Sequence, residues 1–332
     1  MPAPIRVIYG CPAINVPTGG IKVIYKQCEL LTSLGVQSYI WHPGSPDFRC
    51  TWFINQVQTI DQHQFNPATD FIILPEIWVG TSVFGALKSM GFKVGVYVQN
   101  AYLTHVKHDE SPKSLAENLL EADLVLSISL DTSSYLANVL KVPLHKIILQ
   151  RYSINIDKFR IQNKFKLITY MPRKLAAHSL RVVSALTPLL PPDWKILSID
   201  NLSEDGVAEI LSQSSIFMAF SEFEGLPVPP VEASLCGNYV IGYHGEGGRE
   251  YWQAPNFTEV NQGDIQGFVK TVLNKVQLLE EDSNHANELL LGINRLRDYF
   301  SPAQEIQFLG ELVKSIQLIF ENSSETSLHV PI

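Results

Sequence analysis

The segment 215–250, SIFMAFSEFEGLPVPPVEASLCGNYVIGYHGEGGRE, constrains the fold of this chain more than any other. Residues 216–220 form an apolar run of the length typical of a buried parallel strand. Two consecutive prolines, Pro229 and Pro230, favour the first turn of a helix, where a missing N–H costs little. The run YVIGY then predicts the next strand. The segment therefore predicts strand, loop, helix and strand, followed by a glycine-rich loop.

The same alternation extends along the whole chain. Strands are expected at 5–9, 36–41, 71–74, 93–98, 124–129, 147–149, 167–170, 194–199, 216–220 and 239–243. Helices are expected at 21–34, 82–90, 111–121, 133–140, 177–190, 203–211, 262–279, 286–299 and 302–319. Strands that alternate with amphipathic helices predict an α/β fold with parallel sheets. We expect one domain at 1–155, a second at 156–300, and a closing helix at 301–320 that packs back towards the first domain.

The composition excludes several functions. The 332 residues include 25 Lys and Arg and 33 Asp and Glu, for a net charge of −8. Nucleic-acid binding needs a basic field, so nucleic acid is not an expected partner. No apolar run reaches the ~18 residues of a membrane span, and the N-terminus lacks the pattern of a secretory signal. The four cysteines lack metal-site spacing and are expected to be reduced, buried thiols of a cytoplasmic protein.

Two carboxylates stand near the predicted helix of the first segment. Glu224 is expected in the loop after the strand, and Glu232 on the helix, so both can face one crevice. A carboxylate there can accept hydrogen bonds from ribose or hexose hydroxyls, and the backbone N–H groups around Gly225 and Leu226 can hold a phosphate. The alternative is that Glu224 is a solvated loop residue and Glu232 only complements the helix dipole.

A basic pair and a glycine pair follow other predicted strands. Arg173 and Lys174 come after the strand LITY, where an Arg fork suits a diphosphate; the alternative is a surface basic pair. Gly19 and Gly20 precede the first helix, where a ligand can approach the backbone closely; the alternative is plain turn chemistry. His105 follows the strand that ends at 98, where a structural or exposed histidine is the commoner case.

The segment SEFEGLPVPPVEASLCG resembles the E-x7-E signature of the retaining glycosyltransferases of family 4, which have the GT-B fold. The lead-in LSQSSIFMAFS, the linker SINIDKF, the Thr18-Gly-Gly loop and the closing YFSPAQEIQFLGEL are also similar to that family. The resemblance implies two Rossmann-like domains with parallel sheets that face each other across a cleft. The first domain would bind the acceptor and the second the nucleotide-sugar donor.

The family also implies roles for individual residues. Glu232 would bind the ribose, Glu224 the transferred sugar and Arg173 the diphosphate. The backbone from Gly225 through Leu226 to Pro227 would assist, and Gly19 and Gly20 would close over the phosphates.

Two positions depart from the family pattern. Where the family has a lysine five residues after the arginine, this chain has His178, and either Lys174 or His178 is expected to replace that lysine. Where the family often has a histidine after the fourth strand, this chain has Gln99 and Asn100, with His105 further on. These polar residues are the expected contacts to the acceptor or the sugar.

The resemblance therefore implies a hexosyltransferase with a nucleoside-diphosphate sugar as donor and a glycan, lipid-linked or small-molecule acceptor. No DxD motif occurs, so no metal ion and no cofactor are expected. The protein is expected in the cytoplasm, with at most peripheral contact to the inner face of the membrane. The alternatives are a non-hydrolysing nucleotide-sugar epimerase, which product analysis without acceptor would reveal, and a non-catalytic sugar-binding protein, which would bind nucleotide without turnover.

Overall fold

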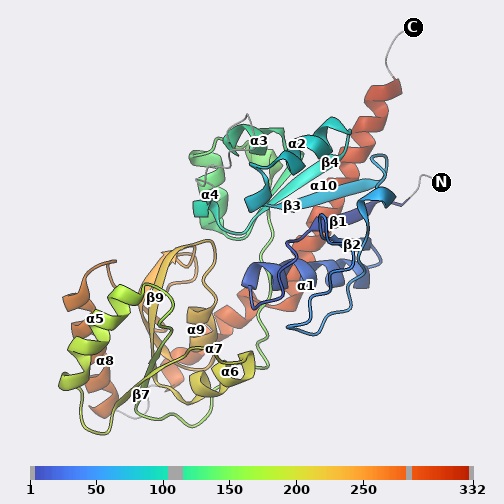
Figure 1. The fold of residues 1–332 in the computed structure, drawn as a ribbon. Coiled ribbons are helices and arrows are strands. Elements are labelled where there is room, and N and C mark those ends of the chain that lie inside the picture. Colours follow the sequence, from blue (N-terminus) through green and yellow to red (C-terminus); the bar gives the residue numbers. More distant parts are fainter. Residues whose placement is uncertain (1–3, 104–114, 282–285, 329–332) are drawn as a thin grey trace. The chain divides into compact units, whose positions relative to one another are not determined.

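The computed structural model describes residues 4–103, 115–281 and 286–328. Its internal contacts divide the chain into two units (Figure 1). Unit 1 comprises Met1–Tyr152 and Ala303–Ile332, and unit 2 comprises Ser153–Pro302. Each unit has its own parallel sheet, as the alternating pattern predicts. No helix in the described part of the chain combines the length and apolarity that crossing a membrane requires.

The sheet of unit 1 has the strand order β2-β1-β3-β4-β5-β6, with all neighbours parallel. Its strands are β1 (Arg6–Gly10), β2 (Gln37–Trp41), β3 (Asp70–Pro75), β4 (Lys93–Val98), β5 (Leu124–Ser127) and β6 (Ile147–Leu149). The central strands β3 and β4 are buried on both faces, which explains why they read as apolar runs without polar alternation.

Helices cover both faces of this sheet (Figure 1). They are α1 (Gly19–Ser33), α2 (Ser82–Ser89), α3 (Leu115–Glu121), α4 (Leu130–Asn138) and α10 (Pro302–Leu328). One core cluster joins the sheet to α2, α3 and α4 through residues such as Phe84, Leu119 and Leu136. On the other face α1 and α10 are linked by an ion pair between Lys26 Nζ and Glu305 Oε2 at 3.1 Å.

The sheet of unit 2 has the order β11-β10-β9-β7-β8, again parallel throughout. Its strands are β7 (Leu167–Tyr170), β8 (Lys195–Ser198), β9 (Ile216–Glu224), β10 (Tyr239–Glu246) and β11 (Phe257–Glu259). Its helices are α5 (Ala176–Leu186), α6 (Glu204–Gln213), α7 (Pro229–Leu235), α8 (Ile265–Glu281) and α9 (Ala286–Tyr299). In Figure 1, α5 and α8 lie on one side of β7 and β9, and α6, α7 and α9 lie on the other.

Several local expectations need correction. Glu224 is not in a loop: β9 continues to it and pairs it with Glu246 of β10. The helix expected at 133–140 begins at Leu130, because the side chain of Ser129 caps it there. Strand β11 was not expected, and α10 is longer than predicted. The start of the helix expected at 111–121 lies outside the described residues.

The helix within the 215–250 segment forms as expected. Prolines occupy the first positions of α7, where their fixed φ suits the helix. Gly237 ends it with a φ of +83°, a left-handed conformation that glycine adopts without strain. This strand–helix–strand unit brings the ends of β9 and β10 to one edge of the sheet.

Candidate active site

The carboxyl edge of the unit 2 sheet holds unusual backbone conformations. In the described part of the chain, five non-glycine residues have a left-handed φ. Four of them lie at or after the carboxyl ends of four neighbouring strands, β7, β8, β9 and β10: Leu175 (φ +43°), Asn201 (+53°), Phe223 (+46°, the residue before the last of β9) and Glu246 (+66°). Such conformations cost free energy and gather at ligand sites, where surrounding structure holds them. This edge is therefore the candidate site of unit 2.

Lys174 and Glu224 meet at this edge. Lys174 follows β7 and Glu224 ends the neighbouring strand β9, so the parallel pairing of the two strands brings them together. Lys174 Nζ lies 3.1 Å from Glu224 Oε2, with the lysine side chain 51% exposed and the carboxylate 18% exposed. A half-exposed ammonium beside a largely buried carboxylate can bind an anion and a hydroxyl group side by side.

Arg173 turns to a different carboxylate. Its Nε lies 3.4 Å from Asp200 Oδ1, in the loop after β8, and its side chain is 73% exposed. An exposed pair of this kind contributes little to stability. The guanidinium is thus positioned at the edge while most of it remains open to solvent.

His178 lies on α5, half-buried, one turn after the basic pair. Its ring meets the Tyr243 ring edge-on, with the centroids 5.8 Å apart. Its Nδ1 is buried and has no hydrogen-bond partner among the described residues. A buried polar atom without a partner is costly, so the position of this nitrogen carries a free-energy cost.

The glycine loop after β10 holds the backbone of Glu224 and Gly225. Gly247 donates its N–H to the Glu224 carbonyl at 3.0 Å. A Cβ at Gly247 would lie 2.0 Å from the Gly225 carbonyl oxygen, so only glycine permits this approach. The Tyr251 hydroxyl donates to the Pro227 carbonyl. These contacts show that the loop after β10 supports the backbone of Glu224.

The other predicted donor residues lie nearby in the chain. Gly225, Leu226 and Pro227 are buried. Pro227 has no N–H, and its carbonyl is engaged with Tyr251, so its part is to shape the loop. Glu232 lies in the first turn of α7 and is half-buried.

Unit 1 brings together a second set of predicted residues. Gln99, directly after β4, donates its Nε2 to the Gly20 carbonyl at 3.2 Å. A Cβ at Gly20 would lie 2.9 Å from Gln99 Oε1, whereas Gly19 has open space. The side chain of Asn100 accepts the backbone N–H of Tyr102 at 3.0 Å. His105 lies outside the described residues.

Glu76 is a site residue of unit 1 that sequence reasoning missed. It follows β3 directly, is 7% exposed, and accepts the Asn100 backbone N–H at 3.0 Å. Burial raises the pKa of this carboxyl to about 7, against the opposing effect of the backbone N–H groups of Glu76, Gln99 and Asn100. The signal in the sequence was an acid two residues after the apolar run 71–74.

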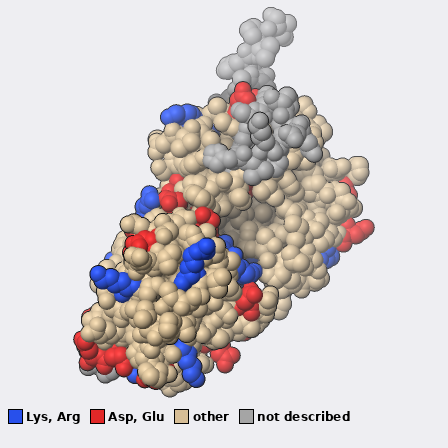
Figure 2. Space-filling model, turned by 60° about the vertical axis from the view of Figure 1, so that its left-hand side comes forward, with Lys and Arg blue, Asp and Glu red and all other residues tan. Residues whose placement is uncertain are grey.

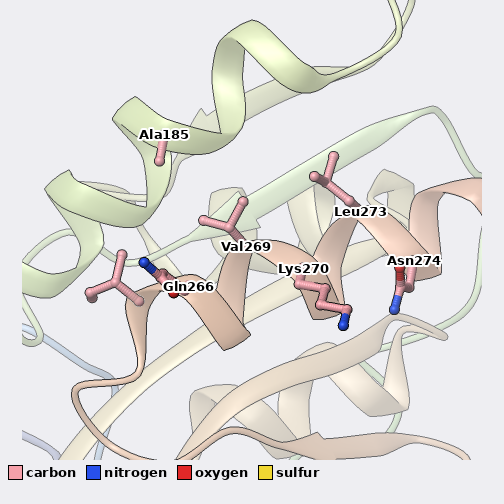
Figure 3. A pocket seen from close by; sticks show the side chains of 7 residues that line it. Ala185, Gln266, Val269, Lys270, Leu273 and Asn274 are labelled. Carbon is pink, nitrogen blue, oxygen red and sulfur yellow. The ribbon is translucent and has the colours of Figure 1, made fainter.

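The surface and its hollows add little to these assignments. Figure 2 shows Lys and Arg side chains interspersed with Asp and Glu on the visible face, with no single basic field. A hollow of about 340 Å³ between α5 and α8 is lined by side chains such as Ala185, Val269 and Leu273 (Figure 3). A larger one of about 610 Å³ in unit 1 lies beside α2. Neither contains a predicted site residue. Within the described ranges, no group of three or more His, Cys, Asp or Glu is arranged to hold a metal ion.

Comparison with known proteins gives a match in structure but not in sequence. No family model matches the chain, and no curated protein is significantly similar to it in sequence. A sucrose-phosphate synthase from Thermosynechococcus elongatus is similar in structure, with a TM-score of 0.70, 13% identity, and coverage of 95% of this chain and 100% of the other. A glycosyltransferase from Rickettsia africae has a TM-score of 0.65 and 14% identity over 96% and 98%.

The Anabaena protein HepE, solved in complex with UDP, has a TM-score of 0.68 and 11% identity over 94% of this chain and 100% of its own. HepE has also been solved with UDP-glucose. These matches span both units. The chain thus has the fold of GT-B glycosyltransferases, with two α/β units that each contain a parallel sheet.

Proposed function

We propose that this protein is a retaining glycosyltransferase that moves a hexose-type sugar from a nucleoside-diphosphate sugar to a glycan, lipid-linked or small-molecule acceptor. The observation that carries the proposal is the Lys174–Glu224 pair, 3.1 Å apart at the strained carboxyl edge of unit 2. The same fold holds UDP and UDP-glucose in solved structures. The resemblance of the E-x7-E segment supports the retaining assignment.

In this proposal unit 2 binds the donor. Arg173 and Lys174 take the diphosphate, and the backbone around Gly225 assists. Glu232 binds the ribose hydroxyls and Glu224 the hydroxyls of the transferred sugar. Prolines at the first positions of α7 remove N–H donors from its first turn. Stabilisation of the negative charge on the leaving diphosphate therefore depends on the side chains of Arg173 and Lys174. His178 lies one turn further along the chain, on α5.

The reaction needs stabilisation of the leaving diphosphate more than it needs a nucleophilic side chain. As the anomeric C–O bond breaks, negative charge grows on the diphosphate oxygens, and preorganised cations lower the barrier there. The acceptor hydroxyl attacks from the same face and passes its proton to the leaving phosphate oxygen. Since lysine and arginine supply the positive charge, no metal ion is needed. Gly19, Gly20, Gln99 and Asn100 of unit 1 serve the acceptor and the donor phosphates.

Ligand binding tests the donor site. Thermal shifts are measured with UDP, GDP, UDP-glucose, UDP-galactose and GDP-mannose, because a ligand that binds the native state raises the melting temperature. Arg173→Ala and Glu232→Ala should lose most of the shift. Lys166→Ala is the matched control: Lys166 precedes β7, at the opposite end from Lys174, and pairs with Asp193 and Glu280. The site assignment is wrong if both site variants bind like the parent.

Turnover tests the reaction type. NMR of the product should show that the anomeric configuration of the donor is retained, and activity should persist in EDTA. Inversion, or loss of activity in EDTA, would contradict the retaining and metal-independent parts of the proposal separately. An altered sugar formed without acceptor would indicate an epimerase instead.

A further inference from the structure

Phe223 is an aromatic residue with an energetically unfavourable backbone conformation. It precedes Glu224 at the end of β9 and is 54% exposed. Its φ of +46° lies in the left-handed region, which a residue with a bulky side chain adopts only at a cost and glycine adopts freely. A side chain buried in a core would offset that cost by removing apolar area from water, but Phe223 as a whole residue keeps more than half of its surface in solvent.

The neighbours of Phe223 are tied to other elements. Glu222 accepts a hydrogen bond from Gln262 Nε2 at 2.7 Å, and Glu224 pairs with Lys174 at 3.1 Å. Behind them, a Cβ at Gly245 would lie 2.6 Å from the Ser221 side chain. The strand end is therefore held from both sides, and this support maintains the strained backbone at Phe223.

An exposed ring beside a carboxylate suits one class of ligand. The axial C–H groups of a pyranose carry slight positive charge, and they pack on the negative face of an aromatic ring. The hydroxyl groups of the same pyranose hydrogen-bond to a carboxylate. Phe223 supplies an aromatic ring and Glu224 supplies a carboxylate, and the two residues are adjacent in the chain.

We propose that Phe223 is a sugar-contact residue whose ring packs against the C–H face of the hexose of a bound nucleotide sugar, while Glu224 binds its hydroxyls. This inference rests on the proposed donor site in unit 2. It adds an aromatic contact to the residues proposed for that site.

The test uses the full-length chain and three forms: the parent, Phe223→Gly and Phe223→Tyr. Each is titrated calorimetrically with the nucleotide sugar that gives the largest thermal shift in the screen above, and with its nucleoside diphosphate. The readout is the ratio of the dissociation constant of the nucleotide sugar to that of the nucleoside diphosphate. This ratio isolates the contribution of the sugar to binding. Phe223→Gly should weaken sugar binding by about 2- to 10-fold relative to the diphosphate, the range typical of an aromatic contact. Phe223→Tyr should keep the parent ratio.

Stability provides the second readout. Because glycine relieves the left-handed strain, Phe223→Gly should raise the melting temperature of the ligand-free protein by about 2–4 °C. A lower melting temperature would mean that the ring serves packing, and would overturn the inference. An unchanged ratio of dissociation constants in Phe223→Gly would overturn it as well. If the parent binds no nucleotide or nucleotide sugar at all, the donor site itself is refuted, and this inference with it.

Discussion

At the scale of single residues, burial decides the protonation of Glu76. Its carboxyl is displaced from an ordinary pKa of 4.5 to about 7, first by desolvation. The backbone N–H of Asn100 holds it at 3.0 Å, so the acid anchors the segment that carries Gln99. The residue is a positioning group under the polar edge of unit 1, and its charge changes close to neutral pH.

Glu76→Gln should therefore flatten the pH dependence of stability. The folded pKa lies above the unfolded value, so between pH 4.5 and about 7 the native state binds more protons, and stability falls as pH rises through this window. A shift of that size corresponds to about 3 kcal/mol. Denaturant unfolding is measured at pH 5 and pH 8. The free energy of unfolding of the variant, relative to that of the parent, should be higher at pH 8 than at pH 5.

The control for this experiment is Glu209→Gln, an exposed glutamate of α6. The difference in free energy of unfolding between this variant and the parent should stay nearly constant between the two pH values. If Glu76→Gln follows the parent across the window, the buried acid is not the group that titrates there.

At the scale of elements, the end of β9 depends on the loop after β10. The strand pairing shifts register between His244 and Glu246, and Gly247 then packs on the backbone of Glu224 and Gly225. A change of register of this kind alters the direction of side chains at a sheet edge. The position of Glu224 is thus a property of two strands and one loop together.

Gly247→Ala should break this support. Its Cβ would lie 2.0 Å from the Gly225 carbonyl oxygen and 2.5 Å from that of Glu224, so the backbone must shift, at about 1–3 kcal/mol. Chemical denaturation and diphosphate titration should both show a loss. Gly206→Ala in α6 is the control: its Cβ would meet nothing closer than 3.5 Å, and it should stabilise the protein by up to about 1 kcal/mol. Equal behaviour of the two variants would show that the close approach is not rigid.

At the scale of the whole molecule, the last helix belongs to the first unit. Gln150 Nε2 donates to the Phe308 carbonyl at 2.6 Å, and Leu309, Leu312 and Ile316 of α10 are buried. A segment that is last in the sequence thus completes the core of the unit that is first. We therefore expect the stability of unit 1 to depend on the packing of α10.

Leu312→Ala should test that dependence. Leu312 is fully buried and Leu318, on the same helix, is 56% exposed. Removing the buried side chain leaves a cavity and should cost about 2–5 kcal/mol, whereas Leu318→Ala should change stability by less than about 0.5 kcal/mol. Calorimetric unfolding of both variants measures the difference. Similar melting curves for the two would mean that α10 adds no core to unit 1.

Local chemistry was enough to predict most elements. Strands β3, β4 and β9 are recognisable in the sequence as apolar runs, because strands of a parallel sheet are buried on both faces. Prolines mark the start of α7 and a glycine marks its end. The misplaced boundaries, such as the start of α4 and the end of β9, arise where a single cap or a neighbouring strand decides how far an element continues.

The sequence alone determined that this protein has two α/β parts with parallel sheets. The reason is that the spacing of apolar residues, and the prolines and glycines that end elements, are local properties of the chain. It also placed Arg173, Lys174, Glu224 and Glu232 after or near strand ends. Only the tertiary structure decided that Lys174 pairs with Glu224 while Arg173 turns to Asp200, because these contacts depend on which strands are neighbours. The burial of Glu76 and the exposure of Phe223 were also invisible in the sequence, since both are set by segments that meet only after folding.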